Sequence, residues 1–471
     1  MEKRYKNLLS NSILFLIANF GSKLISFILV PYYTHVLSTA EYGTVDILVA
    51  TVSLLSPIVT FGIGDVITMY LVRREVEESE ILTNSTIIII LGNILVCIVY
   101  PFLLLSETFK EYIFQFIFLT ILTSLYAILQ SYVRGIGRVK AFAFSGIMYT
   151  AVLAVCNILF LLVFKLGITG YLLSMIFAYI VPVLFLLSMI DLRQFNISKF
   201  DKKLIREIMI LSIPLIPNAV LWWLMNISDK YAISFFLGLA MNGIYSVAHK
   251  LPSIISVVYS IFQQAWQLTT FELSEKEERS VVYTNIFELL TGVLFVSSSF
   301  LLILGRIYVE YFCEKTYLEA WLLIPILLYS AIFNSLSGFL GSSYILMKNT
   351  KGALRVTTVG VLINVVLNLI FVQLFGLVGA AVATCIGFAY MSVKKYLDTR
   401  EFVEIKFNKI RFLSANLLIV IGMISVMIKN TTIYYGVNVV IVLAMLVNYK
   451  GVMEKVLEKI YSGLLHRKEK K

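Results

Sequence analysis

The sequence has 471 residues, of which 59% are hydrophobic and 14% charged, with 39 basic residues, 28 acidic residues and a formal net charge of +11. Soluble domains carry about 25% charged residues, so this composition, with a mean hydropathy of +0.89, excludes an ordinary soluble domain and indicates an all-α polytopic membrane protein. The basic excess then reflects membrane topology and not nucleic-acid binding, and the cysteines Cys97, Cys156, Cys313 and Cys385 form no disulfide or metal-binding pattern.

Fourteen apolar stretches are long enough to cross a bilayer, which takes about 20 residues of helix. They lie at 12–33, 43–71, 84–105, 112–133, 142–164, 168–190, 208–236, 241–270, 281–304, 318–345, 354–375, 377–398, 410–428 and 431–449. An even number of spans puts both termini on one side of the membrane. With the N-terminus inside, inner segments hold 31 Lys and Arg and outer loops hold 5, so the positive-inside rule predicts that both termini are cytoplasmic.

The two halves of the chain share short motifs. LSTAEYG at 37–43 and LGLAMNG at 237–243 have the pattern L-x-x-A-x-x-G at an offset of 200. A repeat of six spans keeps its orientation, so we expect two parallel repeats, with a shared site near the bilayer midplane. The expected parts are an N lobe at 1–190, a cytoplasmic linker at 191–207, a C lobe at 208–398, and two extra spans with a basic tail at 399–471.

Polar side chains recur at steps of three and four in the first two spans of each lobe, which places them on one face of each helix. A charge at bilayer depth costs roughly 2.5–3.5 kcal/mol on insertion scales, so such groups usually face a hydrated cavity. The residues expected to line that cavity are Asn19, Ser22, Ser26, Asp46, Ser53, Asn218, Trp222, Ser246, His249 and Ser253.

Three lysines, Lys23, Lys230 and Lys250, lie well inside predicted spans, each six or more residues from a span end. Lysine is a compact positive charge that suits phosphate, so a cavity with lysines at its centre favours an anionic ligand. The structural alternative is that these lysines pair with aspartates on neighbouring helices. Likewise, His249 is either a hydrogen-bonding residue between helices or a pH-sensing group. No phosphate-binding G-x-x-x-x-G-K-[ST] loop occurs, so ATP is not expected to drive the protein.

Several motifs resemble one known family. They are FLIANFGSKLISFILVPYYTHVLSTAEYG at 15–43, PLIPN at 214–218, WWLMNISDKY at 222–231, GIYSVAHKLP at 243–252 and IFQQAWQ at 261–267. Together they resemble the Wzx-type polysaccharide flippases, within the multidrug/oligosaccharidyl-lipid/polysaccharide flippase superfamily. The resemblance covers the first eight spans well and the later spans by pattern only.

The resemblance implies a MATE-like fold that works by alternating access and uses no cofactor, no metal and no catalytic residue. The implied cargo is an undecaprenyl-diphosphate-linked oligosaccharide of O-antigen, capsule or exopolysaccharide, moved from the inner to the outer leaflet of the bacterial cytoplasmic membrane. On this basis Lys23, Lys230 and Lys250 are candidate contacts to the diphosphate, and Asn226 and Asp229 shape the site or couple it to H⁺ or Na⁺. Membrane lipids and a polysaccharide polymerase are the implied partners.

Two other functions remain open. A multidrug or cation antiporter of the same fold would need buried acids, whereas the first span offers Lys23 and no acid. A membrane enzyme such as a repeat-unit polymerase or an acyltransferase would need a large outer loop or paired histidines. The longest outer loop, near 305–317, is short, and the histidines His35, His249 and His466 are far apart in the sequence. A purely structural scaffold would not need polar helix faces.

Overall fold

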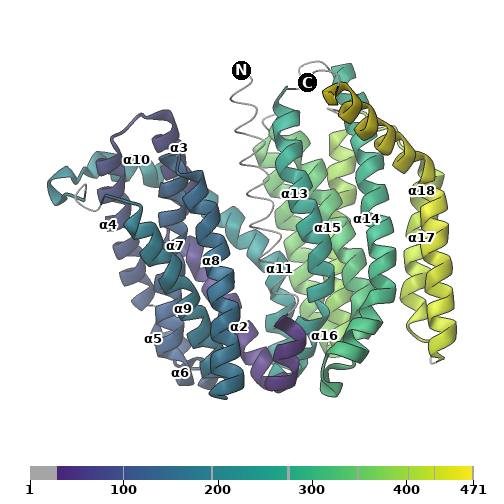
Figure 1. The fold of residues 1–471 in the computed structure, drawn as a ribbon, viewed down its shortest axis with the longest axis horizontal. Helices are drawn as coiled ribbons and strands as arrows, with labels where there is room; N and C mark the ends of the chain where they lie inside the picture. The colour runs from purple at the N-terminus through teal and green to yellow at the C-terminus, as the bar shows by residue number, and fades with distance from the viewer. Residues whose placement is uncertain are drawn as a thin grey trace. The chain divides into compact units, whose positions relative to one another are not determined.

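The computed structural model of the chain is built from helices (Figure 1). The residues that it describes are 29–98, 100–191, 195–272, 276–346, 349–400, 403–428 and 430–468, and within them every regular element is a helix. Contacts within the chain define two compact units, Met1–Gly243 and Ile244–Lys471.

The first unit holds the described helices up to α11, and α12 begins in it. After the helical residues 29–36, its elements are α2 (Thr39–Val59), α3 (Gly64–Arg73), α4 (Glu78–Cys97), α5 (Tyr100–Leu103), α6 (Glu107–Glu111), α7 (Ile113–Gly135), α8 (Val139–Asn157), the π-helix η1 (Ile158–Val163), α9 (Gly167–Ser188), η3 (Ile197–Lys199), α10 (Lys202–Ser212), η4 (Ile213–Leu215), α11 (Ile216–Phe236) and α12 (Leu239–Ala248). Helix α11, which lies in the predicted C lobe 208–398, belongs to the first unit, as does α10, which spans the end of the predicted linker and the start of that lobe.

The second unit is made of longer helices. They are α13 (Lys250–Glu272), α14 (Lys276–Phe312), η5 (Lys315–Tyr317), α15 (Ala320–Leu346), α16 (Thr350–Thr399), α17 (Lys409–Ser425) and α18 (Thr431–Lys468). Helix α16 contains one residue with non-helical backbone angles, Gly376, at φ 62° and ψ −139°. Glycine adopts positive φ without a steric penalty, so the helix can be interrupted at this residue. Gly376 lies between the predicted spans 354–375 and 377–398.

Ten helical stretches of the described chain are long and apolar enough to cross a membrane, which makes the chain a multi-pass membrane protein. One of the ten, Lys351–Thr399, contains two predicted spans. The predicted span 12–33 lies largely outside the described residues. The span 241–270 is divided between α12 and α13, and 410–428 corresponds to α17, a helix of 17 residues. The count of fourteen spans therefore stays a prediction.

Two predicted spans are not continuous helices. The stretch 43–71 is broken between α2 and α3, where Phe61 and Gly62 take positive φ values of 48° and 65°. The stretch 241–270 is broken at His249, between α12 and α13. Pro252, in the first turn of α13, has no N–H to bond the carbonyl of Ala248. Hydropathy shows neither break, because each predicted span remains long and apolar on average, even with His249 and Lys250 inside the second one.

Helices α2 and α12 cross at a pair of glycines. A Cβ added to Gly43 would lie 1.9 Å from the carbonyl oxygen of Leu239, and one added to Gly243 would lie 2.0 Å from the carbonyl oxygen of Thr39. The contact is reciprocal: the glycine that ends each L-x-x-A-x-x-G motif faces the carbonyl of the third residue of the other copy, Leu239 or Thr39. The two copies of the motif thus pack directly on each other, and the close approach of their backbones requires glycine.

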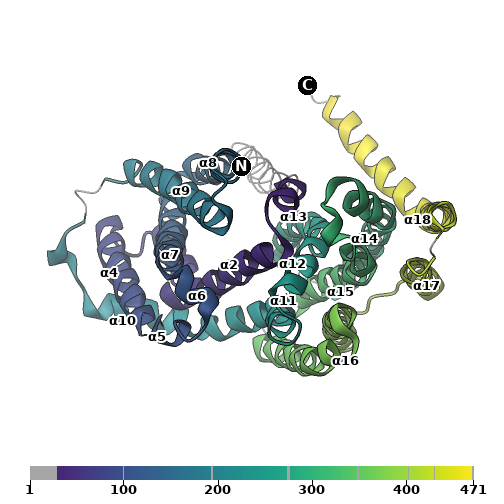
Figure 2. The same ribbon diagram turned by 90° about the horizontal axis from the view of Figure 1, so that it is seen from below.

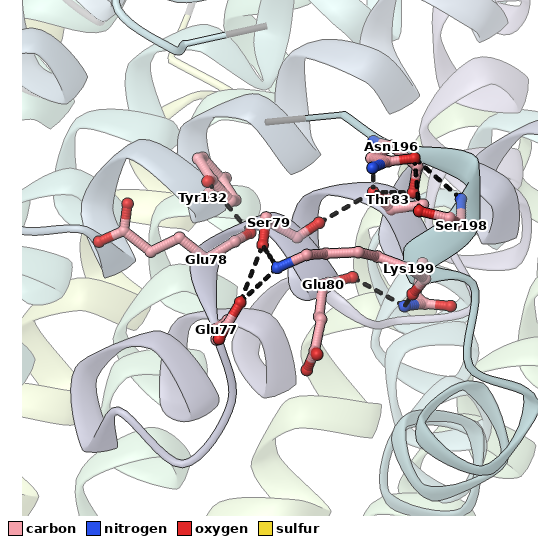
Figure 3. Close-up of polar contacts among 10 residues, drawn as sticks. Glu77, Glu78, Ser79, Glu80, Thr83, Tyr132, Asn196, Ser198 and Lys199 are labelled. Atoms are coloured by element: carbon pink, nitrogen blue, oxygen red, sulfur yellow. Dashed lines mark hydrogen bonds and ion pairs between the residues drawn. The ribbon is translucent and has the colours of Figure 1, made fainter. Parts of the chain in front are cut away.

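The predicted linker forms polar contacts with the start of α4 (Figure 3). Within the segment 196–201, Lys199 forms an ion pair with Glu77. The amide of Asn84 donates to the carbonyl of Lys199 at 3.1 Å and accepts from the backbone N–H of Asp201 at 3.0 Å. The linker is also shorter than expected, because α10 already begins at Lys202. These contacts hold the segment 196–201 against the start of α4.

Candidate functional site

An ion pair joins α2 and α11 inside the first unit. The ammonium Nζ of Lys230 donates to Oδ1 of Asp46 at 2.9 Å, and the two side chains are 14% and 15% exposed. The other carboxylate oxygen of Asp46 accepts from Asn242 Nδ2 at 3.4 Å. Because both partners are largely shielded from water, the pair is a stronger electrostatic contact than one on an open surface.

Asp229, which precedes Lys230, has a different environment. It is 1% exposed, and its Oδ1 accepts from the backbone N–H of Lys230 at 2.8 Å. The carboxylates of Asp46 and Asp229 therefore both contact Lys230, one through the ammonium group and the other through the backbone.

Aromatic residues of α11 complete the contact with α2. The indole Nε1 of Trp223 donates to the carbonyl of Ala50 at 3.0 Å and to Ser53 Oγ at 3.1 Å. The hydroxyl of Tyr231 shares a hydrogen bond of 2.5 Å with Thr51, and the rings of Trp223 and Tyr231 lie 5.5 Å apart. These bonds fix the orientation of both rings, since a buried indole or phenol group usually requires a hydrogen-bond partner.

Exposed polar groups lie on the same helices. Asn218, Asn226 and Ser53 are exposed and Trp222 is half-buried. The amide of Asn226 donates to the carbonyl of Trp222 at 2.6 Å. We call Asp46, Ser53, Trp223, Asn226 and Lys230 together the α2–α11 polar face. An ammonium group, an indole and amides on one face can bind a ligand that is partly anionic and partly hydrogen-bonding.

The other predicted site residues are either outside the described residues or in the second unit. Asn19, Ser22, Lys23 and Ser26 are outside. In the second unit Ser246 is buried in α12, whereas Ser253 is exposed and donates to the carbonyl of Lys250 at 2.6 Å. The ring of His249 packs edge-on against Tyr245 at 4.7 Å. Lys250 is half-buried and makes no ion pair with any residue that the structure describes.

Sequence reasoning did not select a cluster of tyrosines in the first unit. Tyr149 and Tyr179 lie 4.7 Å apart, and Tyr126 lies 5.6 Å from Tyr179. The amide of Gln130 donates to the hydroxyl of Tyr126 at 2.6 Å. These half-buried residues come from α7, α8 and α9. The one sequence signal for such a cluster was the abundance of tyrosine, with 27 residues in all. Across the described residues, no group of three or more His, Cys, Asp or Glu is arranged to hold a metal ion.

Comparison with known proteins identifies relatives in sequence. The family profile described as "Polysaccharide biosynthesis protein" matches residues 8–267. A probable low-salt glycan biosynthesis flippase, Agl15 of Haloferax volcanii, is 30% identical over 206 residues, which are 42% of this chain and 43% of that protein. An uncharacterized membrane protein of Methanocaldococcus jannaschii is 26% identical over 83% of this chain and 100% of its own.

Solved structures share the fold. The lipid II flippase MurJ in an inward closed conformation aligns with a TM-score of 0.74 and 16% identity, over 94% of this chain and 100% of its own. A multidrug resistance MATE family transporter of the MOP superfamily, in an inward-facing conformation, aligns with a TM-score of 0.68 and 13% identity, over 86% and 99%. At such identities the likeness shows a MATE-like fold and nothing about the ligand.

Proposed function

The chain belongs to the polysaccharide biosynthesis protein family, and from this premise we propose that it is a flippase for lipid-linked oligosaccharides. In this proposal the cargo is carried on undecaprenyl diphosphate and moves from the inner to the outer leaflet of the bacterial cytoplasmic membrane by alternating access. The family match carries the proposal, because residues 8–267 include both the α2–α11 polar face and Lys250. The similarity to a glycan flippase and the fold shared with a lipid II flippase favour a transporter over an enzyme.

The proposed architecture has fourteen spans in two parallel repeats of six, followed by two extra spans, with both termini in the cytoplasm. The ten candidate spans and the MATE-like fold support this arrangement. The reciprocal close approach at Gly43 and Gly243 supports a relation between the halves, because the two copies of the repeated motif pack on each other there. In this proposal the parts 1–190 and 208–398 are the two repeats and 191–207 connects them, while contacts group the helices up to α11 with the first repeat.

In the proposed mechanism Lys23, Lys230 and Lys250 contact the diphosphate of the carrier. The α2–α11 polar face supports a role for Lys230, because exposed Asn226 and half-buried Trp223 precede it on α11 by four and seven residues, which places the three on one helix face. The pairing of Lys230 with Asp46 adds a condition: a diphosphate reaches this ammonium only by sharing it with the carboxylate or displacing it. Asn226 and Asp229 then shape the site without contacting phosphate directly.

The membrane potential could drive this transport without ATP. One charge that crosses 100 mV changes free energy by roughly 2.3 kcal/mol. A diphosphate with about two negative charges would gain roughly 4–5 kcal/mol on leaving an inside-negative cell, if its charge moved uncompensated. Coupling to H⁺ or Na⁺ and handover to a polysaccharide polymerase are compatible additions.

A cation antiporter of the same fold is the competing transporter function. Such a protein would bind a positive ligand through a carboxylate. In the first unit Asp46 already bonds Lys230 and Asn242, so a cationic ligand would have to compete with an ammonium group. An anionic ligand must likewise compete with Asp46 for Lys230, so this pair does not separate the two functions. Lys250, which forms no ion pair with any described residue, favours an anionic ligand.

Lipid analysis of cells tests the proposal. Cells that lack this protein should accumulate a diphosphate-linked oligosaccharide on the inner leaflet and lose surface polysaccharide. Wild-type protein and the control Lys203→Ala, an exposed lysine at the start of α10, should restore the polymer. Lys250→Ala should not restore it although the protein still inserts, and Lys250→Arg should be milder than Lys250→Glu because phosphate requires the positive charge. If no lipid-linked saccharide accumulates in the deletion strain, the proposed cargo is wrong.

A further inference from the structure

An open pocket of about 620 Å³ lies where α7 ends, α8 begins and α9 ends, and it shares no residue with the α2–α11 polar face. Helices α8 and α9 run side by side in both views (Figure 1 and Figure 2). The residues that line the pocket are Gly137, Arg138, Val139, Lys140, Ala141, Phe144, Phe185 and Met189. Two of them are positively charged and the others are apolar or glycine, so the pocket combines a cationic part with an apolar part.

No acidic residue of the described chain pairs with the two positive charges at the pocket. Arg134, one turn earlier, pairs with Asp65 at 3.3 Å. Arg138 and Lys140 are both exposed, and neither forms an ion pair with any residue in the described ranges. Arg138 donates from Nη1 to the carbonyl of Met189 at the end of α9. A guanidinium group has five N–H donors, so this bond positions the group and leaves others to bind a ligand.

The apolar part of the pocket continues onto the outer surface of α8. The rings of Phe144 and Phe185 pack edge-on at 5.3 Å. Phe144 is 50% exposed and Ile147, three residues further along the same helix face, is 43% exposed. Because α8 belongs to a candidate membrane span of mean hydropathy 2.3, this exposed face suits an acyl chain. A Cβ on Gly137 would contact nothing within 4 Å, so the turn leaves open space beside Arg138.

We propose that this pocket is a binding site for an anionic phospholipid of the inner leaflet. The phosphodiester would lie between Arg138 and Lys140, and one acyl chain would follow Phe144 and Ile147. Charge complementarity selects this occupant: basic pockets between membrane helices on the cytoplasmic side bind negatively charged head groups, and a zwitterionic lipid would gain much less from two unneutralised cations. The turn lies on the side that the positive-inside rule assigns to the cytoplasm, where anionic lipids face the protein. This site is independent of the cargo proposed above.

Native mass spectrometry of the purified, delipidated full-length protein tests the proposal. The probes are phosphatidylglycerol, phosphatidylcholine and inorganic phosphate. Wild-type protein should retain phosphatidylglycerol in preference to phosphatidylcholine. Each basic residue near a membrane surface contributes about fivefold to the binding of an anionic lipid, so Lys140→Gln should weaken phosphatidylglycerol binding about fivefold, and Arg138→Gln with Lys140→Gln about 25-fold. The matched control Lys202→Gln with Lys203→Gln removes two exposed charges elsewhere in the unit and should leave the preference unchanged.

Further variants separate the lipid from other occupants and guard against misfolding. Phe144→Ser should weaken long-chain phosphatidylglycerol and leave the binding of glycerol phosphate unchanged. Lys140→Gln disturbs no hydrogen bond of the fold that the structure shows, so it keeps the test valid if the loss of Arg138 loosens α9. The assignment would be overturned if wild-type protein retained both lipids equally, or if the double variant retained phosphatidylglycerol fully. It would also be overturned if the lysine control lost as much phosphatidylglycerol as the double variant, or if inorganic phosphate displaced the lipid.

Discussion

Breaking the ion pair between Lys230 and Asp46 should destabilise the first unit. Removing one partner of a buried pair costs about 3–5 kcal/mol, because the other charge is left uncompensated. The side chains are 14% and 15% exposed and Asn242 still donates to Asp46, so we expect about 2–3 kcal/mol for Lys230→Met, below the fully buried case. A change of 1 kcal/mol shifts the melting temperature of a domain of this size by about 2–4 °C, so the shift should be about 4–12 °C.

The assay is a double-mutant cycle on thermal unfolding of the purified protein, with the variants Lys230→Met, Asp46→Asn and both together. The double variant removes both charges and should regain most of the lost stability, which gives a coupling of about 1–2 kcal/mol. The control Lys203→Met should change stability by no more than about 0.5 kcal/mol. Additive effects of the two single variants would refute the reasoning. If the double variant is stable but does not restore surface polysaccharide, Lys230 acts on the ligand as well as on the fold.

Three further predictions follow from other contacts. Gly243→Ala places a Cβ 2.0 Å from the carbonyl oxygen of Thr39. Helices α2 and α12 must then separate, and the free energy of unfolding should fall by about 1–3 kcal/mol in the thermal-unfolding assay. The control Gly146→Ala adds a Cβ that meets no atom within 4 Å and should be neutral or stabilising. The pKa of Glu77 is lowered from 4.5 by the hydrogen bond and charge of Lys199 and by Ser79, so the attachment of the linker should be complete above pH 4.5 and weaken as the pH falls through the lowered pKa. Hydrogen exchange of 196–201 should rise at acid pH, and Lys199→Gln should remove that pH step; a pH step of the same size in the variant would contradict the assignment. Tyr231→Phe removes the hydroxyl that bonds Thr51 at 2.5 Å and should cost about 0.5–1.5 kcal/mol in thermal unfolding, whereas equal stability of Tyr231→Phe and wild type would show that Thr51 finds another partner.

Hydropathy was sufficient to predict most helices, because the length of an apolar run is a local property of the sequence. The boundary at Gly376 lies where the sequence placed it. The breaks at Phe61 and His249 were missed. They depend on backbone angles and on a single proline, which hydropathy averaged over a whole span does not register. The prediction of polar faces at helical spacing identified Asp46, Ser53 and Asn226 as candidates, but spacing alone did not show their contacts.

The sequence by itself determined that this chain is a helical membrane protein of a polysaccharide family, because composition, helix length and motifs are all local signals. Only the tertiary structure decided that Lys230 bonds Asp46, a residue 184 positions away, and that Trp223 bonds the backbone of α2. It also showed that Arg134 is neutralised by Asp65 while Arg138 and Lys140 have no acidic partner among the described residues. Which charges meet depends on how helices from distant parts of the chain pack, and no periodicity within one helix contains that information.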